Sequence, residues 1–170
     1  MIRLPILILA LVLFHLSISY GDVTPFSKLR PDLPPKIKIN SLVNKEVLSP
    51  GEKFRFYLSL EIQEGWHIYS IQPLDGNGVL ATQINLNDKT FEDVTLWNES
   101  ATQLMHDGAQ AKIVKGHIST AEFSKQFRVS DKMTSGNYPI RGNLIYRACD
   151  NRMCTLPQSL FFESWIRIGR

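Results

Sequence analysis

The sequence predicts an all-β protein, an antiparallel β-sandwich of roughly seven to nine strands. Three observations support this prediction. Apolar and polar residues alternate over several short stretches, which is the pattern of a half-buried strand. Clusters of glycine, proline, asparagine and serine separate these stretches, as turns do. No stretch carries the sustained 3.6-residue apolar period of an amphipathic helix, so strands packed in two layers are the expected architecture.

The clearest predicted strand spans residues 53–62. Its apolar side chains fall on one face and its polar side chains on the other, so one face is expected to be buried. The same pattern over residues 121–129 places Phe123 and Phe127, together with Phe54 and Phe56 of the first strand, in the predicted core. The remaining predicted strands are 66–71, 83–86, 91–97, 112–118, 138–148 and 159–168. Turn signals lie at 49–51, 75–78, 107–108 and 135–137.

Residues 1–19 are predicted to be a secretory signal peptide. Arg3 supplies a positive start, an apolar core spans 4–18, and Ser17 and Ser19 are placed like the small residues of a cleavage site. The apolar core is shorter than the ~20 residues that a membrane-spanning helix needs. We therefore expect cleavage near Ser19, a periplasmic or secreted product, and no stable membrane insertion after cleavage.

The rest of the chain divides into a short linker and one domain. Residues 20–35 contain four of the prolines and little periodicity, which predicts an extended linker. Residues 36–170 are expected to form a single domain, because 170 residues suit one domain better than two. Lysine and arginine exceed aspartate and glutamate by only 19 to 16, and this small, evenly spread excess does not predict a nucleic-acid partner.

The chain has two cysteines, Cys149 and Cys154, separated by four residues. In an exported protein such a pair is a structural disulfide or part of a redox relay, because thiols outside the cytosol tend to be oxidised. A bridge that closes a loop of ~6 residues contributes about 2 kcal/mol, against about 4.7 kcal/mol for a loop of ~100 residues. The pair is thus a weak staple, better suited to opening and closing than to bracing. A structural disulfide is the alternative interpretation of this pair.

Metal binding is a further possibility. Cys149, Met153 and Cys154 are soft donors that suit Cu(I), although other loops would have to supply more ligands. No hydrolase motif such as G-x-S-x-G or H-E-x-x-H is present.

The run YRACDNRMCTLP at 146–157, with GWHIYS at 65–70, resembles the N-terminal periplasmic domain of the DsbD thiol:disulfide interchange proteins. Members commonly show Y-Q-A-C and C-x-P before their last strand, and G-W/Y-x-x-Y after an early strand. The resemblance covers roughly residues 35–168. It implies an immunoglobulin-like sandwich that takes electrons from a membrane-embedded thiol transporter and passes them to periplasmic thioredoxin-like clients. It also implies thiol:disulfide interchange, or protein-disulfide reductase, activity, with no cofactor and no resident metal.

The resemblance also assigns roles to residues. Cys154 corresponds to the sulfur that forms the mixed disulfide with a client, and Cys149 corresponds to its resolving partner. Tyr69 falls where the family keeps a tyrosine beside the disulfide, and His67 falls where many members have another aromatic residue. A cap loop that shields the disulfide is expected within residues 97–111. Its candidate residues are Leu104, Met105, His106 and Asp107.

Charged groups beside the cysteines are expected to tune their chemistry, because exchange needs a thiolate. Arg147 and Arg152 favour the anion and Asp150 opposes it. His67 is a candidate proton shuttle near neutral pH.

The chain departs from the family pattern in three respects. The cysteine spacing is one residue shorter than in the best-known enterobacterial form, and Arg147 replaces the usual glutamine. The expected cap segment has no phenylalanine, so Leu104 or Met105 would take its place. Nothing follows the predicted sandwich, so we expect a stand-alone exported protein that borrows electrons from another membrane protein. The alternatives are a non-catalytic immunoglobulin-like binding module with an inert disulfide and a Cu(I)-handling module.

Overall fold

A computed structural model describes residues 35–169. The predicted signal peptide, and the predicted linker apart from Pro35, lie outside this range. The described residues form thirteen strands and one 3-10 turn, with no α-helix among them, and nine of the strands have at least three residues. The elements are β1 (Ile37–Val43), β2 (Val47–Leu48), β3 (Lys53–Ile62), β4 (His67–Tyr69), η1 (Gly78–Leu80), β5 (Gln83–Leu86), β6 (Glu92–Asp93), β7 (Asn98–Glu99), β8 (Gln103–Asp107), β9 (Lys112–Ile118), β10 (Thr120–Arg128), β11 (Gly136–Tyr146), β12 (Ala148–Cys149) and β13 (Gln158–Ile168).

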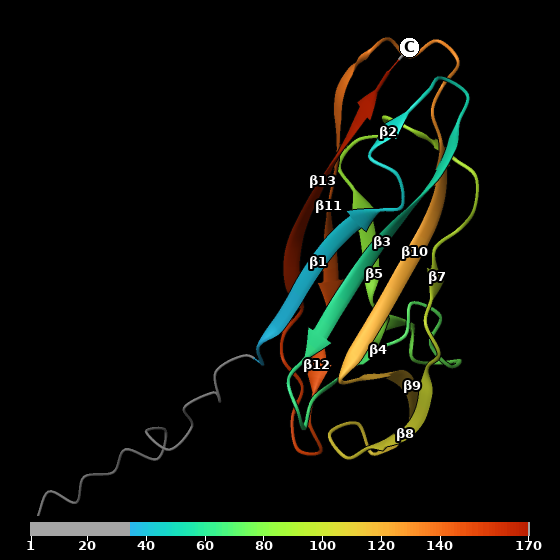
Figure 1. Ribbon diagram of the computed structural model, residues 1–170. Helices are drawn as coiled ribbons and strands as arrows, with labels where there is room; N and C mark the ends of the chain where they lie inside the picture. The colour runs from blue at the N-terminus through green and yellow to red at the C-terminus, as the bar shows by residue number, and fades with distance from the viewer. Residues whose placement is uncertain (1–34, 170) are drawn as a thin grey trace, which may run out of the picture. The chain divides into compact units, whose positions relative to one another are not determined.

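Two of the three sheets form a sandwich (Figure 1). One sheet has the order β1-β3-β10-β6, with β7 also paired to β10, and the other has the order β2-β13-β11-β5. All of these pairings are antiparallel except that of β2 with β13. When seven of these strands are lettered A to G in chain order, β1, β3, β10 and β6 are A, B, E and D, and β5, β11 and β13 are C, F and G. This is the ABED and CFG strand arrangement of immunoglobulin domains. The predicted antiparallel, immunoglobulin-like all-β fold is confirmed, and its nine strands of three or more residues agree with the expected seven to nine.

The core between these two sheets is apolar and rich in phenylalanine. Phe54, Phe56, Phe123 and Phe127 are each at most 2% exposed, as predicted. The ring of Phe56 on β3 lies 5.6 Å from that of Phe162 on β13, so the contact crosses the sandwich. Full burial of each such side chain stabilises the fold by roughly 1.5–3 kcal/mol. Alternation along β3 and β10 therefore fixes which faces meet.

A third sheet, with the order β12-β4-β9-β8, lies at one end of the sandwich (Figure 1). Its strands come from three connections, namely those between β3 and β5, between β7 and β10, and between β11 and β13. Connections of this kind emerge at the same end of an immunoglobulin-like sandwich. Gly116 permits the close pairing of β9 with β4, because a Cβ at this position would lie 2.2 Å from the carbonyl oxygen of Ile68. The third sheet therefore brings together residues that are distant in sequence.

The predicted strands agree with the structure at 53–62, 83–86 and 112–118, and nearly agree at 121–129 and 159–168. The predicted strand 91–97 is wrong beyond Glu92–Asp93, because Val94 and Thr95 both donate their N–H groups to the carbonyl of Gln126. The sequence reading named no strand at β1, β2, β7 or β8. Among the described residues, no helix is long and apolar enough to cross a membrane.

Candidate functional site

The candidate site is the Cys149–Cys154 disulfide, at the sandwich end that carries the third sheet. The two sulfur atoms are bonded at 2.05 Å. Cys149 lies in β12, which pairs with β4 so that Cys149 stands opposite His67. Cys149 is fully buried, whereas Cys154 is partly exposed in the loop that precedes β13. The two sulfurs therefore differ in their access to a partner.

Backbone hydrogen bonds hold the cysteine loop independently of the disulfide. Asp150 donates its N–H to the carbonyl of Met153 at 3.0 Å, and Thr155 donates to the carbonyl of Ala148 at 2.8 Å. The Asp150 carboxylate accepts the N–H groups of Arg152 and Met153, both at 2.7 Å. Opening the sulfur–sulfur bond consequently leaves the loop with its own internal connections.

Tyr69 lies against the disulfide, as the resemblance implied. Its hydroxyl group donates to Oδ2 of Asp107, and its oxygen lies 2.8 Å from the Cys149 sulfur and 3.5 Å from the Cys154 sulfur. Burial raises the pKa of Tyr69 far above its usual value, and the hydrogen bond to Asp107 and the charge of that carboxylate raise it further, while Arg147 acts in the opposite direction. The hydroxyl group therefore stays protonated and joins the sulfur to the carboxylate.

Asp107, at the end of β8, is fully buried. Its Oδ1 atom accepts the backbone N–H groups of Ala109 at 2.9 Å and Gln110 at 3.2 Å. Its Oδ2 atom accepts the Tyr69 hydroxyl group and lies 3.4 Å from Nε2 of the buried His67. The turn after β8 thus fixes Oδ1 of Asp107, while Oδ2 faces Tyr69 and His67 beside the disulfide. His67, Asp107 and Cys149 each place one potential metal-ligand atom within 4.8 Å of the others.

The sequence reading missed two contacts in this turn. Nε2 of Gln110 lies 3.4 Å from the Cys154 sulfur. A Cβ on Gly108 would lie 2.4 Å from the carbonyl oxygen of Asn151, so the turn packs directly on the cysteine loop. The Asp107–Gly108 pair was visible as a turn signal, but nothing in the sequence marked Gln110 or showed which loop the turn would touch.

The segment expected to cap the disulfide, residues 97–111, contains β7, β8 and the turn between β8 and β9. Of the candidate residues, Met105 packs against the small apolar cluster that contains Tyr69 and Cys149. Leu104 is 68% exposed, and His106 is exposed on the same strand. Met105 and Asp107 therefore lie at the disulfide, while Leu104 and His106 face solvent.

The charged neighbours named from the sequence have different positions. Arg147 is partly exposed, and its charge reaches Tyr69. Burial acts to raise the pKa of Asp150, but the backbone N–H groups of Arg152 and Met153 outweigh it and hold that pKa below its usual value. A negative charge therefore stands next to Cys149. The Arg152 guanidinium lies 3.9 Å from the Asp150 carboxylate and is mostly exposed.

A second polar cluster with little exposure, also unmarked in the sequence, joins β7, the residues after β4, and His117 of β9. The Glu99 carboxylate on β7 accepts hydrogen bonds from the Ser70 hydroxyl group and the Ile71 N–H group, and it lies 3.0 Å from Nε2 of His117. Burial acts to raise the pKa of Glu99, but these hydrogen bonds outweigh it and lower the pKa to about 2. Ile71 donates its N–H to this side chain and not to a neighbouring strand, so the predicted strand 66–71 does not reach Ile71, and β4 spans only His67–Tyr69.

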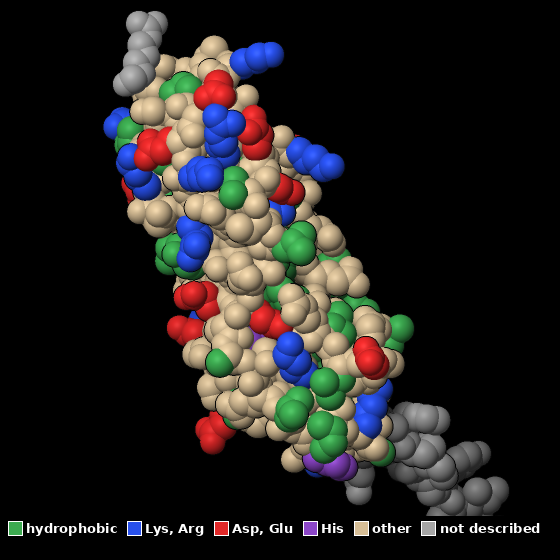
Figure 2. Space-filling model, turned by 90° about the vertical axis from the view of Figure 1, so that its right-hand side faces the viewer, with side chains coloured by type: hydrophobic (Ala, Val, Ile, Leu, Met, Phe, Trp, Pro, Cys, Tyr) green, Lys and Arg blue, Asp and Glu red, His purple; other side chains and the backbone are tan. Residues whose placement is uncertain are grey.

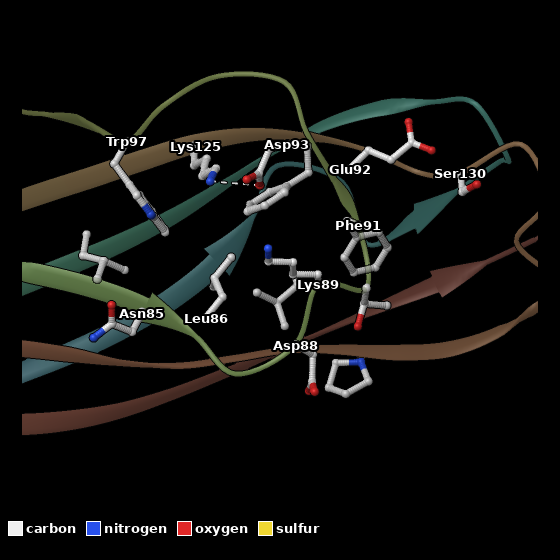
Figure 3. Close-up of a pocket in the computed structure, with 15 residues that line it drawn as sticks. Asn85, Leu86, Asp88, Lys89, Phe91, Glu92, Asp93, Trp97, Lys125 and Ser130 are labelled. Carbon is white, nitrogen blue, oxygen red and sulfur yellow. Dashed lines mark ion pairs between the residues drawn. The ribbon is translucent and has the colours of Figure 1, made fainter.

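A cavity of about 650 Å³ lies beside the edge strand β5, lined by residues of β5, of the segment 88–93 and of β10 (Figure 3). The Lys125 ammonium group pairs with Asp93 at 2.9 Å and lies 5.9 Å and 5.4 Å from the ring centres of Trp97 and Phe127. None of the residues around the disulfide lines this cavity. It is a separate feature of the sandwich.

No family model and no curated protein matches the sequence. Thirteen solved chains match this one, including three from different organisms. One is the N-terminal periplasmic domain of ScsB from Proteus mirabilis, with 13% identity, a TM-score of 0.45, and coverage of 77% of this chain and 45% of that chain. A second is the reduced N-terminal domain of DsbD from Neisseria meningitidis, with 13% identity, a TM-score of 0.45, and coverage of 76% of this chain and 88% of that chain. A third is a family 123 glycoside hydrolase from Clostridium perfringens, with 8% identity, a TM-score of 0.40, and coverage of 77% of this chain and 27% of that chain.

Two of these structures are N-terminal domains of DsbD and ScsB. The chain is similar to them. It spans less than half the length of the ScsB structure.

Proposed function

We propose that the chain is an exported thiol-disulfide exchange domain in which Cys154 forms the mixed disulfide and Cys149 resolves it. The supporting observation is the unequal burial of the two sulfurs. Cys149 is fully buried against Tyr69, whereas Cys154 is partly exposed. Exchange requires one sulfur that a partner can reach, and Cys154 meets that requirement.

The proposed reaction has two displacement steps. In the reduced domain, the Cys154 thiolate attacks one sulfur of a client disulfide, which forms the mixed disulfide and releases the other client sulfur as a thiolate. Cys149 then attacks the Cys154 sulfur, which re-forms the Cys149–Cys154 bond and releases the second client thiolate. The client gains two electrons and the domain loses two. Protons from water and from Cys149 complete the client thiols.

Tyr69 and Asp107 support the second step. Before Cys149 attacks, its thiol must lose a proton, and the Tyr69 oxygen lies 2.8 Å from its sulfur. The hydroxyl group of Tyr69 in turn donates to the Asp107 carboxylate. A proton passed to Tyr69 is matched by one passed on to Asp107, so the phenol stays neutral. The buried sulfur thereby reaches a base without contact with water.

The rim of the site suits a protein client. On the face drawn in Figure 2, hydrophobic side chains gather toward the lower end, beside a histidine. Exposed hydrophobic residues of the β8–β9 hairpin and the cysteine loop are Leu104, Ile113, Ile118, Met153 and Leu156. We propose periplasmic thioredoxin-like proteins as clients and a membrane-embedded thiol transporter as electron donor, which agrees with the motif resemblance.

Trapping tests the assignment. A Cys149→Ala variant keeps Cys154 and lacks the resolving sulfur, so it should accumulate mixed disulfides with thioredoxin-like proteins, seen as reducible bands on non-reducing gels and identified by mass spectrometry. Cys154→Ala should not. The reverse pattern would exchange the two roles.

A potential titration separates exchange from an inert bridge. An exchange domain should equilibrate with a thioredoxin-like partner at roughly −120 to −270 mV, whereas a structural bridge lies below about −300 mV. A bridge that resists reduction, together with no trapping by either variant, would leave the non-catalytic module as the better description.

A further inference from the structure

We propose that reduction of the disulfide creates a zinc site whose four ligand atoms are the Cys149 and Cys154 sulfurs, Nε2 of His67 and Oδ2 of Asp107. This inference rests on the proposed function only in that the bond must be reducible. It concerns a ligand of the reduced domain, and it adds a form of regulation to the exchange reaction.

The spacing of three of the four donors, those of His67, Asp107 and Cys149, suits tetrahedral zinc. With metal–ligand bonds of about 2.0–2.3 Å, the ligand atoms of a tetrahedral site stand about 3.3–3.8 Å apart. Nε2 of His67 and Oδ2 of Asp107 are 3.4 Å apart, and these atoms and the Cys149 sulfur all lie within 4.8 Å of one another. Once the Cys149–Cys154 bond is broken, the two sulfurs are no longer bonded to each other, and both can bind one metal ion.

The surrounding groups already hold the carboxylate in place. Two backbone N–H groups fix Oδ1 of Asp107, and the Tyr69 hydroxyl group donates to Oδ2. Hydrogen bonds of this kind orient metal ligands and are a regular part of metal sites. His67, Asp107 and Cys149 are all buried, so bulk water competes little with the protein ligands.

The donor set favours zinc over Cu(I). Zinc accepts a mixture of sulfur, imidazole and carboxylate ligands, whereas Cu(I) prefers soft sulfur donors. The soft donor closest in sequence to Cys154 is Met153, which is 38% exposed. His67 and Asp107 therefore distinguish this site from the cysteine–methionine set that the loop sequence alone offers.

Formation of the site needs a dithiol reductant. The reductant transfers two electrons and two protons to the Cys149–Cys154 bond and becomes a disulfide itself. Zn²⁺ then displaces the two thiol protons and binds both thiolates, with no change in its own oxidation state. A metal-bound Cys154 is not free to attack a client, so bound zinc suppresses exchange until it is removed.

Calorimetry with Zn²⁺ under anaerobic conditions tests the site. The reduced full chain should bind one Zn²⁺, and the oxidised chain should bind none. His67→Ala and Asp107→Asn should each weaken binding about tenfold or more, while the matched control His106→Ala, an exposed histidine on β8, should change it less than about twofold. Circular dichroism checks that each variant is folded.

Co²⁺ provides a second measurement that needs no variant. In the reduced chain it should give sulfur-to-cobalt charge-transfer absorption in the near ultraviolet and the strong visible bands of a tetrahedral ion. The proposal fails if the reduced chain binds no Zn²⁺, if Cu(I) binds and Zn²⁺ does not, or if His67→Ala and Asp107→Asn both bind as tightly as the parent. If zinc binding fails in one of these ways while the chain still exchanges disulfides normally in the presence of a chelator, only the zinc site is ruled out, and the proposed function is unaffected. If no dithiol reduces the disulfide, both the zinc site and the proposed function are ruled out.

Discussion

Asp107 on β8 and Glu99 on β7 are two carboxylates with little exposure that make the same kinds of contact, yet only Asp107 lies beside sulfur. Each carboxylate accepts a hydroxyl hydrogen bond and faces Nε2 of a histidine. The first cluster is Asp107 with Tyr69 and His67, and the second is Glu99 with Ser70 and His117. Tyr69 and Ser70 are consecutive residues at the end of β4, so their side chains point to opposite faces and reach different carboxylates. The Glu99 cluster can therefore serve as an internal control for the Asp107 cluster, which contacts the disulfide.

The two clusters differ in the elements that they connect. Glu99 ties β7 to the turn after β4, and Nδ1 of His117 is buried without a partner among the described residues. Asp107 ties the β8 turn to the disulfide, through a hydroxyl group that touches sulfur. We therefore expect changes in the Asp107 cluster to alter exchange, and changes in the Glu99 cluster to alter stability.

The largest expected effect is on exchange itself. Cys154→Ser should reduce disulfide exchange with a thioredoxin-like client on the order of a thousandfold or more, because a serine hydroxyl cannot replace the thiolate. Glu99→Gln should leave the rate within about threefold, since Glu99 contacts neither cysteine. Stopped-flow fluorescence of the client measures both. Similar losses in the two variants would remove the distinction between the clusters.

Removing one hydroxyl group from each cluster sharpens the comparison. Tyr69→Phe keeps the ring but removes the atom 2.8 Å from the Cys149 sulfur. It should slow resolution of the mixed disulfide about a hundredfold, in the range of lost acid–base catalysis. Ser70→Ala removes the corresponding hydroxyl group beside Glu99 and should leave this rate unchanged. Acid quenching followed by mass spectrometry measures the mixed disulfide. Equal rates in parent and Tyr69→Phe would rule out the proton path through Tyr69.

The second cluster should respond to acid. The pKa of Glu99 in the folded chain, about 2, lies below its ordinary value of 4.5. Its charged form therefore stabilises the fold above about pH 5, and this contribution is lost as the pH falls toward about 2. Glu99→Gln should lower the free energy of unfolding by about 2 kcal/mol at pH 7, because it replaces a charged hydrogen-bond acceptor. It should also flatten the dependence of stability on pH between these limits.

Urea unfolding at several pH values measures the effect of Glu99. Glu61→Gln is the matched control, because Glu61 is a mostly exposed carboxylate whose partner, Lys38, is also exposed. It should leave the unfolding midpoint at pH 7 nearly unchanged. A pH dependence that is the same in Glu99→Gln and the parent would show that another group carries it.

The two clusters also show how far the sequence predicts this molecule. Alternation along 53–62 and 121–129 predicts the sandwich, because one buried face needs only a period of two residues. The motif resemblance pointed to His67 and Tyr69 and gave Asp107 as one of four cap candidates, and the structure brings these three residues to the disulfide. Glu99 and His117 carry no local signal, since their burial depends on strands that are separate in sequence. The same holds for Gln110, which reaches Cys154 only because the β8 turn packs on the cysteine loop.

The smallest expected effect concerns Arg147, which stands where the resembled family usually has glutamine. Its charge acts on Tyr69 in opposition to burial and to Asp107, and its side chain is partly exposed, so water screens it. Arg147→Gln should therefore change the resolution rate less than about threefold, and the change should shrink as salt is raised. The same stopped-flow assay at low and high ionic strength measures this. A loss as large as that of Tyr69→Phe would mean that the arginine contacts the reacting sulfurs directly during exchange.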